Sequence, residues 1–117
     1  MIIPPGPLKV MVATKPVDFR KGAVSLAALV EHELGMKPFS GTAYIFRSRR
    51  ANRIKLLVWD GTGLVLVSKV LQTGGFHWPR VGDGVMRLTG SQASALFEGL
   101  QWTRMHCPPV KKPLLAR

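Results

Sequence analysis

The feature that most constrains the fold is a run of three apolar, strand-like segments in the middle of the chain. They are "TAYIFRS" (42–48), "RIKLLVWD" (53–60) and "GLVLVSKVL" (63–71), each rich in β-branched or aromatic residues. The first two are joined by the short basic link "RRAN". The last two are joined by "DGTG", where Asp-Gly and a second glycine supply the backbone angles of a tight hairpin. This spacing predicts a three-stranded antiparallel meander.

Two further strands and two helices complete the expected set of elements. "LKVMVATK" (8–15) alternates as a strand does, and "DGVMRLT" (83–89) has the same character. A helix is expected at about 21–34, where apolar residues recur every four positions, and a second helix at about 90–100. Residues 72–79 are expected to turn and to form at most a short edge strand that a proline ends.

These elements predict an α+β fold, in which two helices pack on an antiparallel sheet of about five strands. One domain is expected over residues 1–103, followed by a basic, Pro-containing tail at 104–117 that we expect to be flexible. Asp18 is the candidate cap of the first helix, with Gly22 at its entry, and Thr89 begins a capping box before the second helix. The residues assigned to the turn between the last two strands of the meander are Asp60, Gly61 and Gly63.

The charge balance favours an anionic partner. Seventeen Lys and Arg against six Asp and Glu give a net charge of +11. Such an excess favours nucleic acid, an acidic protein or an anionic membrane. No apolar stretch is long enough for a transmembrane helix, and the start "MIIPPGPLKV" lacks the apolar region of a signal peptide. With Cys107 as the single cysteine, we expect a cytoplasmic protein without membrane contact.

The stretch "FRSRRANRIK" (46–55) is the strongest candidate for a polyanion-binding surface. Its cations are Arg47, Arg49, Arg50, Arg53 and Lys55. If residues 48–52 form the loop, Arg47 lies opposite Arg53, and Lys55 shares their face of the sheet. Arg49 and Arg50 then lie at the tip, and Lys69 joins the cluster if the register of the next turn allows.

This arrangement favours anion binding, because close like charges destabilise a hairpin and a bound anion would relieve that cost. A two-stranded basic ribbon can enter the major groove or lie along phosphates. The alternative is that the charges only keep an edge hairpin soluble and unpaired with other sheets.

The segment "DFRKG" (18–22) is a second candidate polyanion site. Arg20 and Lys21 stand at the expected start of the first helix, where backbone N–H groups attract anions. The alternative, which the sequence favours here, is structural: Asp18 caps the helix and Arg20 pairs with a carboxylate.

Catalytic and metal-binding patterns are weak. A nuclease needs two or three carboxylates that converge on metal ions, whereas the candidates are scattered in turns and caps: Asp18, Asp60, Asp83 and Glu98. No zinc spacing is matched by His32, His77, His106 and Cys107. The aromatic residues of "FHWP" (76–79) are expected in the core rather than in a stacking platform for single strands. We therefore expect no catalytic residue, no metal and no cofactor.

Seven short segments, taken together, are distinctive. In order they are "DFRKG" (18–22), "PFSG" (38–41), "FRSRR" (46–50), "IKLLVWDGTG" (54–63), "FHWP" (76–79), "DGVMRLT" (83–89) and "LFEGLQW" (96–102). As a set they resemble the TnpB-type accessory protein, the product of the second open reading frame in bacterial insertion elements of the insertion-sequence 66 family. The likeness covers about residues 5–103. It implies a small protein encoded beside a separate transposase that carries the chemistry.

The combined expectation is a non-catalytic accessory protein of DNA transposition. It would bind DNA, the transposase of the same element, or both, through the basic hairpin. One alternative is a protein–protein adaptor that does not touch DNA, and a less favoured one is a small metal-dependent nuclease.

Overall fold

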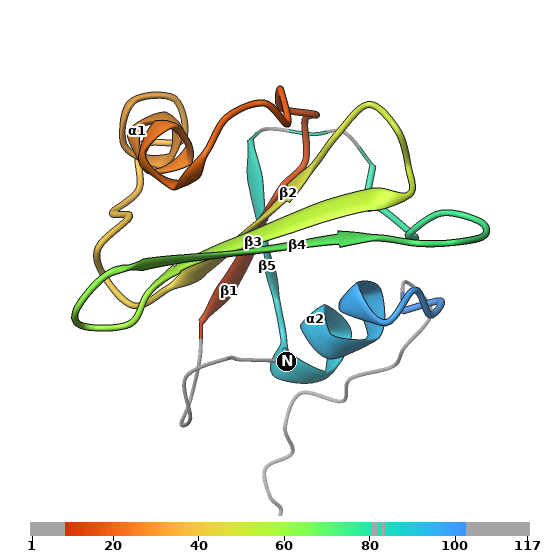
Figure 1. The fold of residues 1–117 in the computed structure, drawn as a ribbon. Helices are drawn as coiled ribbons and strands as arrows, with labels where there is room; N and C mark the ends of the chain where they lie inside the picture. Colours follow the sequence, from red (N-terminus) through yellow and green to blue (C-terminus); the bar gives the residue numbers. More distant parts are fainter. Residues whose placement is uncertain (1–8, 81, 83, 103–117) are drawn as a thin grey trace, which may run out of the picture.

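Five strands form one sheet that carries a helix on each face (Figure 1). The structure is a computed structural model that describes residues 9–80, 82 and 84–102. The elements in chain order are β1 (Val10–Ala13), α1 (Ala23–His32), β2 (Ala43–Arg47), β3 (Arg53–Trp59), β4 (Leu64–Val70), β5 (Val85–Leu88) and α2 (Gly90–Phe97). The α+β class predicted from the sequence is confirmed.

The sheet is mixed rather than wholly antiparallel. Its strand order is β4-β3-β2-β1-β5, and three of the four pairings are antiparallel. The exception is β1 with β2, which run parallel with Val10 opposite Ala43, so the antiparallel prediction was wrong for this pair. The reason is that α1 carries the chain back along the sheet as a crossover, which lets β2 start at the same edge as β1. The loops that follow β1 and β2 therefore leave the sheet at the same end.

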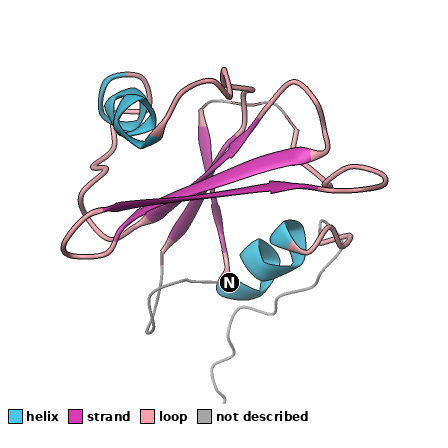
Figure 2. Ribbon diagram, in the orientation of Figure 1, coloured by secondary structure: helices cyan, strands magenta, loops and turns pink. Residues whose placement is uncertain are grey.

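The two helices cover opposite faces, giving three layers (Figure 2). Successive strand residues point to alternate faces, so each strand feeds both layers. On one face, Leu26 and Val30 of α1 pack over Phe46. On the other, Leu96 of α2 packs over Ile45. Among the described residues, no helix combines the length and apolar character needed to cross a bilayer.

The predicted register of the basic hairpin was wrong by one residue. Arg47 lies opposite Ile54 rather than Arg53, and Phe46 lies opposite Lys55. A shift of one residue moves a side chain to the other face of the sheet. Arg53 and Lys55 therefore share the α1 face, while Arg47 lies on the α2 face and not beside them.

Burial explains this register. Ile45 lies opposite Leu56, and their exposed fractions are 0% and 2%. The predicted pairing would have set Ile45 against Lys55 under α2, which would bury an ammonium group in an apolar layer. The observed register instead keeps both apolar side chains in the core and leaves Lys55 half-buried on the other face.

Both helices are shorter than predicted. The predicted cap was wrong for α1: its N-cap is Gly22, which makes no side-chain cap, and Asp18 lies four residues upstream. Near its C-terminal end, Gly35 adopts φ 65°, a left-handed conformation that favours glycine. The predicted capping box of α2 is confirmed, since Thr89 and Gln92 each accept from the other's backbone N–H.

The segment 72–79 is a loop and not the short edge strand that the sequence allowed. It runs back beneath the β2–β3 turn, where the carbonyl of Ala51 accepts hydrogen bonds from the Phe76 N–H at 2.8 Å and the Trp78 Nε1–H at 3.1 Å. Gly75 is required at this crossing, because a Cβ there would lie 2.9 Å from the Cβ of Ala51. The predicted tail at 104–117 and Asp83 lie outside the described residues.

Candidate nucleic-acid interface

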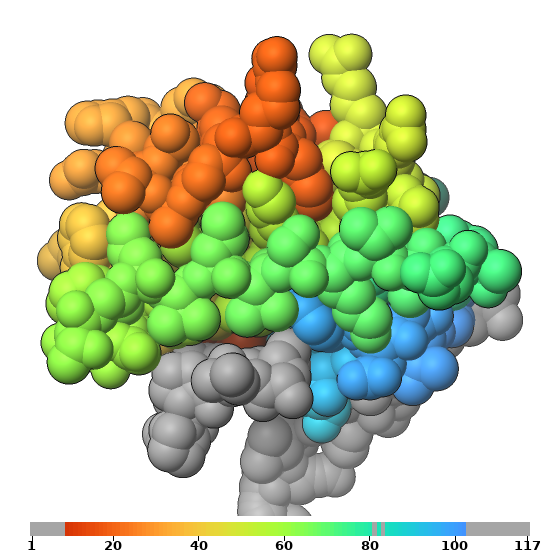
Figure 3. Space-filling view, in the orientation of Figure 1, coloured from red at the N-terminus to blue at the C-terminus, as the bar shows by residue number. Residues whose placement is uncertain are grey.

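The loops after β1 and β2 meet at one end of the sheet and enclose an open groove of about 710 Å³. The Val17 N–H donates to the Arg47 carbonyl at 2.8 Å and joins the loop after β1 to the end of β2. We call this hollow the cationic groove; its walls are Pro16, Val17, Asp18, Phe19, Arg20, Ser48, Arg49, Arg50 and Arg53. In Figure 3 it lies at the top, between the orange-red loop and the yellow-green turn.

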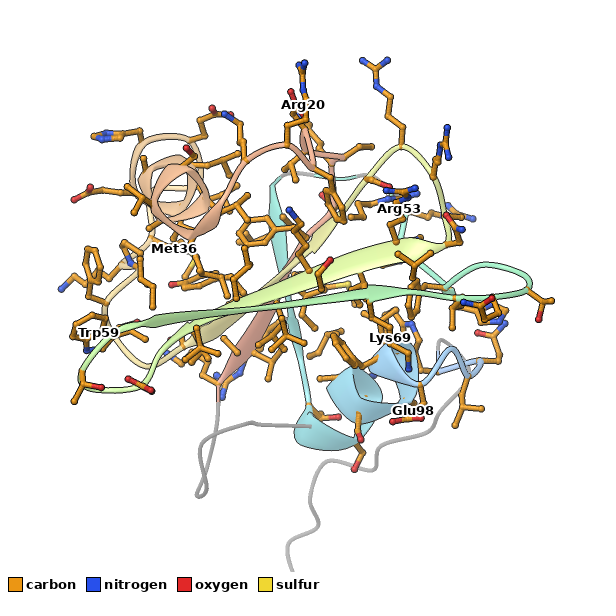
Figure 4. All side chains as sticks on the ribbon, viewed as in Figure 1. Arg20, Met36, Arg53, Trp59, Lys69 and Glu98 are labelled. Carbon is orange, nitrogen blue, oxygen red and sulfur yellow. The ribbon has the colours of Figure 1, made fainter. Side chains whose placement is uncertain are left out.

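The groove unites the two basic motifs that the sequence presented separately. Arg20 comes from "DFRKG", and Arg49, Arg50 and Arg53 come from the hairpin "FRSRRANRIK". Figure 4 shows Arg20 on the loop at the top of the molecule and Arg53 below the hairpin turn. Asp18 is the one carboxylate among the lining residues, so positive charge dominates the groove.

Arg53 differs from the other arginines of the groove in having a buried donor without a partner, a feature that it shares with Arg47 on the α2 face. Its side chain is half-buried, and its Nε–H is buried without a hydrogen-bond partner in the described part of the chain. A buried donor without a partner costs roughly 1–3 kcal/mol, and more when it is charged. Because the Nε atom itself is covered, a phosphate in the groove would meet the outer part of the Arg53 guanidinium.

The hairpin turn that carries Arg49 and Arg50 is held by its own hydrogen bonds. Ser48 Oγ donates to the Arg50 carbonyl at 2.8 Å and accepts from the Arg50 N–H at 3.0 Å. Ser48 is buried, whereas both arginines are exposed. The turn therefore presents two cations from a fixed backbone, which lowers the entropic cost of binding.

Asp18 and Arg20 form an ion pair on the opposite wall of the groove. Arg20 donates through Nε to both carboxylate oxygens at 3.1 Å and through NH2 to Oδ2 at 2.8 Å, and its backbone N–H adds a bond at 2.9 Å. These bonds hold the pKa of the Asp18 carboxyl well below its usual range. The side chain thus orders the loop, which is the structural alternative that the sequence favoured for Arg20.

The Asp18 carboxyl is expected to remain ionised in acid until well below the ordinary midpoint of about pH 3.9. Because its folded-state pKa is lowered, the ion pair stabilises the fold above the unfolded-state pKa. That contribution is lost as the pH falls through the folded-state pKa. Carboxyl NMR titration of the wild type and Arg20→Ala measures this, and the variant should titrate at higher pH. Equal midpoints would show that Arg20 does not hold the carboxylate.

Lys55 supports the groove from below and does not line it. Its Nζ donates to the carbonyls of Phe19 and Lys21 at 2.7 and 3.1 Å, and it lies 5.0 Å from the centre of the Phe19 ring. The ammonium group therefore fastens the loop after β1 onto the sheet. Lys21, predicted beside Arg20, is half-buried and lines an adjoining cavity of about 340 Å³ with Lys15.

Two other predicted cations lie on the α2 face, away from the groove. Lys69 Nζ donates to the Phe97 carbonyl at 2.8 Å, at the C-terminal end of α2. Arg47 lies 5.2 Å from the Trp78 ring centre and donates to the Pro79 carbonyl at 3.5 Å. Burial lowers the pKa of the Arg47 guanidinium. The expected cluster of Arg47, Arg53 and Lys55 on one face is replaced by separate roles.

The candidate catalytic carboxylates that the structure describes, Asp18, Asp60 and Glu98, do not gather. Asp60 Oδ1 accepts from the N–H groups of Thr62 and Gly63, both at 2.9 Å, and these bonds lower the pKa of its carboxyl. Gly61 has φ 105° in the same turn, between β3 and β4. Within 9–80, 82 and 84–102, no three His, Cys, Asp or Glu side chains are close enough to hold a metal ion.

Pro16, Val17, Phe19 and Ser48 were not predicted as part of the interface. No local pattern indicates them, because they line the groove only through the parallel pairing of β1 with β2. A parallel assignment of these two strands would have placed both loops at one end and shown the contact.

Comparison with known proteins gives the family. Residues 8–107 match the family described as IS66 Orf2-like protein (TnpB_IS66). The chain is 43% identical over 113 residues to the uncharacterized protein y4jC of Sinorhizobium fredii, covering 97% of each chain. It is 35% identical over 95 residues to the uncharacterized protein y4hO of the same organism, covering 81% of this chain and 83% of the relative. No solved structure matches. The chain therefore belongs to the IS66 Orf2-like family, whose members are accessory proteins of these insertion elements.

Proposed function

We propose that this accessory protein binds DNA through the cationic groove and does so mainly by contacts to phosphates. The observation behind the proposal is the convergence of Arg49, Arg50 and Arg53 on one open groove, which faces Arg20 in its ion pair with Asp18. Guanidinium groups match phosphate oxygens in geometry as well as in charge. The chemistry of transposition would remain with the element's transposase.

Two further features support phosphate contacts rather than base reading. The residues that line the groove lie in loops, apart from Arg53 at the start of β3, and none of them belongs to α1 or α2. Arg53 has a buried donor that lacks a partner, so part of its desolvation cost is already present before binding. Such contacts position a protein on DNA and carry no sequence information directly.

The test is a titration of duplex DNA from the element's end at several salt concentrations. The variant is Arg49→Ala/Arg50→Ala/Arg53→Ala. Each lost phosphate contact should reduce the slope of log affinity against log salt by about 0.9, so three should reduce it by about 2.7. At low salt we expect the affinity to fall by about a thousandfold or more, because three charge-assisted hydrogen bonds at roughly 1.5–3 kcal/mol each are lost and every 1.4 kcal/mol is about tenfold.

A charge-matched control separates the groove from net charge. Lys9→Ala/Lys37→Ala/Arg87→Ala removes three exposed cations that lie outside the groove. This control should retain most of the affinity and most of the slope. If both triple variants lose the same amount, the groove is not the site. If neither variant nor wild type binds DNA at low salt, the groove instead fits an acidic protein surface, such as one on the transposase.

A further inference from the structure

The two outer strands of the sheet differ in how they meet solvent. β5 has four residues, and two of them, Met86 and Arg87, are exposed. A short edge strand with an outward charge is a common defence against unwanted pairing. β4 has seven residues, "LVLVSKV", and pairs on one side only, with β3. The unpaired backbone groups on its other side form the longer open edge of the described sheet.

β4 lacks the usual protection of an edge. It contains no proline, and its register with β3 is regular over all seven residues, without a bulge. Its single charge, Lys69, turns inward to the Phe97 carbonyl at 2.8 Å. Val70 is instead 47% exposed at the end of the strand. Figure 3 shows the green segment that contains β4 running across the front of the molecule.

We propose that a second copy of this chain pairs with β4 to form a continuous ten-stranded sheet across a two-fold axis. Antiparallel pairing about Val67 would align all seven residues, with Leu64 opposite Val70 of the other copy. The opposed positions are mostly apolar, and no charge on one copy faces a charge on the other. The edge of each copy is satisfied by the same edge of its partner, which closes the assembly as a dimer.

The printed segments on either side of the described residues are poor partners for this edge. The sequence before β1, "MIIPPGPL", and the sequence after Trp102, "TRMHCPPVKKPLLAR", are interrupted by prolines. Neither contains a proline-free run as long as β4, and proline cannot donate to a ladder of strand hydrogen bonds. A second β4 is the complementary strand that the chain supplies.

Charge gives the dimer a distinctive response to salt. Each copy carries a net charge of +11, so two copies repel one another unless salt screens them. We therefore expect association to strengthen as salt rises. DNA binding by phosphate contacts has the opposite dependence. The two behaviours can therefore be measured and judged apart.

The geometry also links the dimer to the groove, and this consequence rests on the proposed function. A two-fold axis perpendicular to the sheet keeps both α1 helices on one side. Arg53 lies opposite Val70, three residues from the axis along β4. With ordinary strand spacings, the two Arg53 Cα atoms would lie about 25 Å apart. The two cationic grooves would then lie at opposite ends of the dimer, and both copies would carry α1 on the same side of the continuous sheet.

The test is sedimentation equilibrium of the full chain without DNA, from about 1 to about 500 µM, the range suited to a small interface. Wild type should show a monomer–dimer equilibrium whose dimer fraction rises with salt. Val70→Asp should weaken the dimer about tenfold or more, because it places a carboxylate in the pairing edge. We expect the monomer fold to stay intact, because the new carboxylate would lie opposite Arg53 of β3. Circular dichroism checks this.

Met86→Asp is the matched control. It makes the same change in charge at an exposed apolar residue on the other edge strand, where the exposed fraction is 39%. It should leave the dimer constant unchanged. A wild type that stays monomeric at the highest concentration and salt would overturn the proposal, and it would leave the β4 edge to a strand from another protein. Equal weakening by both substitutions would also overturn it.

Discussion

Phe46→Ala is expected to lower the free energy of unfolding by about 3–5 kcal/mol, as the truncation of buried aromatic residues does. Phe46 has an exposed fraction of 0% and packs between the sheet and α1. Its removal leaves a cavity under the helix that the neighbouring side chains cannot fill without shifting. Domains of this size have a total stability of about 5–15 kcal/mol, so the loss is a large share. Urea unfolding followed by tryptophan fluorescence measures it.

Phe39→Ala is the control for the same chemical change. Phe39 is 57% exposed and meets the edge of the Trp59 ring, with the ring centres 5.4 Å apart. Its truncation loses little buried area and one aromatic contact, worth about 0.5–1.5 kcal/mol. Comparable losses for Phe39→Ala and Phe46→Ala would mean that the α1 layer is not the packed core described here.

The elements could be predicted from the sequence because their signals are local. The three segments of the meander and the capping box at Thr89 depend on residues a few positions apart, and the structure has them all. The direction of β1 relative to β2 does not depend on either strand alone. It depends on the helix between them, which returns the chain to the same edge. A strand–helix–strand order was available in the sequence, and giving it more weight would have predicted the parallel pair.

The register of the basic hairpin shows a second limit. A loop at 48–52 is compatible with more than one pairing, because a turn can absorb one extra residue. The choice is made by the burial of Ile45 and Leu56, which requires contacts with α2 that are distant in sequence. A shift of one residue in register moves side chains to the opposite face of the sheet. The predicted register therefore placed Arg47 and Arg53 on one face, whereas the structure has them on opposite faces.

The individual roles of the cations could not be read from the sequence. Lys55 and Lys69 look as available for a ligand as Arg49 and Arg50. In the fold, each lysine instead crosses from a strand to a backbone carbonyl and lies near a phenylalanine ring. A long side chain can bind a carbonyl of another element only if tertiary packing brings that carbonyl within reach. The sequence of the lysine's own segment does not show whether this happens.

Lys55→Met is expected to lower the free energy of unfolding by about 3–6 kcal/mol, since it removes two hydrogen bonds from a charged donor that contribute about 1.5–3 kcal/mol each. Methionine keeps most of the side-chain volume, but it leaves the carbonyls of Phe19 and Lys21 without their donor. The loop after β1 then loses its attachment to β3, and one wall of the cationic groove loses its fixed position. Chemical unfolding gives the stability, and DNA titration at constant salt gives the effect on the groove.

Lys69→Met provides the comparison that separates geometry from charge. It removes the same single positive charge and a similar contact with an aromatic ring, since Lys69 lies 5.5 Å from the centre of Phe97. It breaks one carbonyl contact instead of two, so the expected loss of stability is about 1.5–3 kcal/mol. Because this contact lies on the α2 face, the groove should remain intact. DNA affinity should therefore fall several-fold more for Lys55→Met than for Lys69→Met. Equal losses of DNA affinity would mean that net charge alone governs binding, and the fixed wall of the groove would then have no part in it.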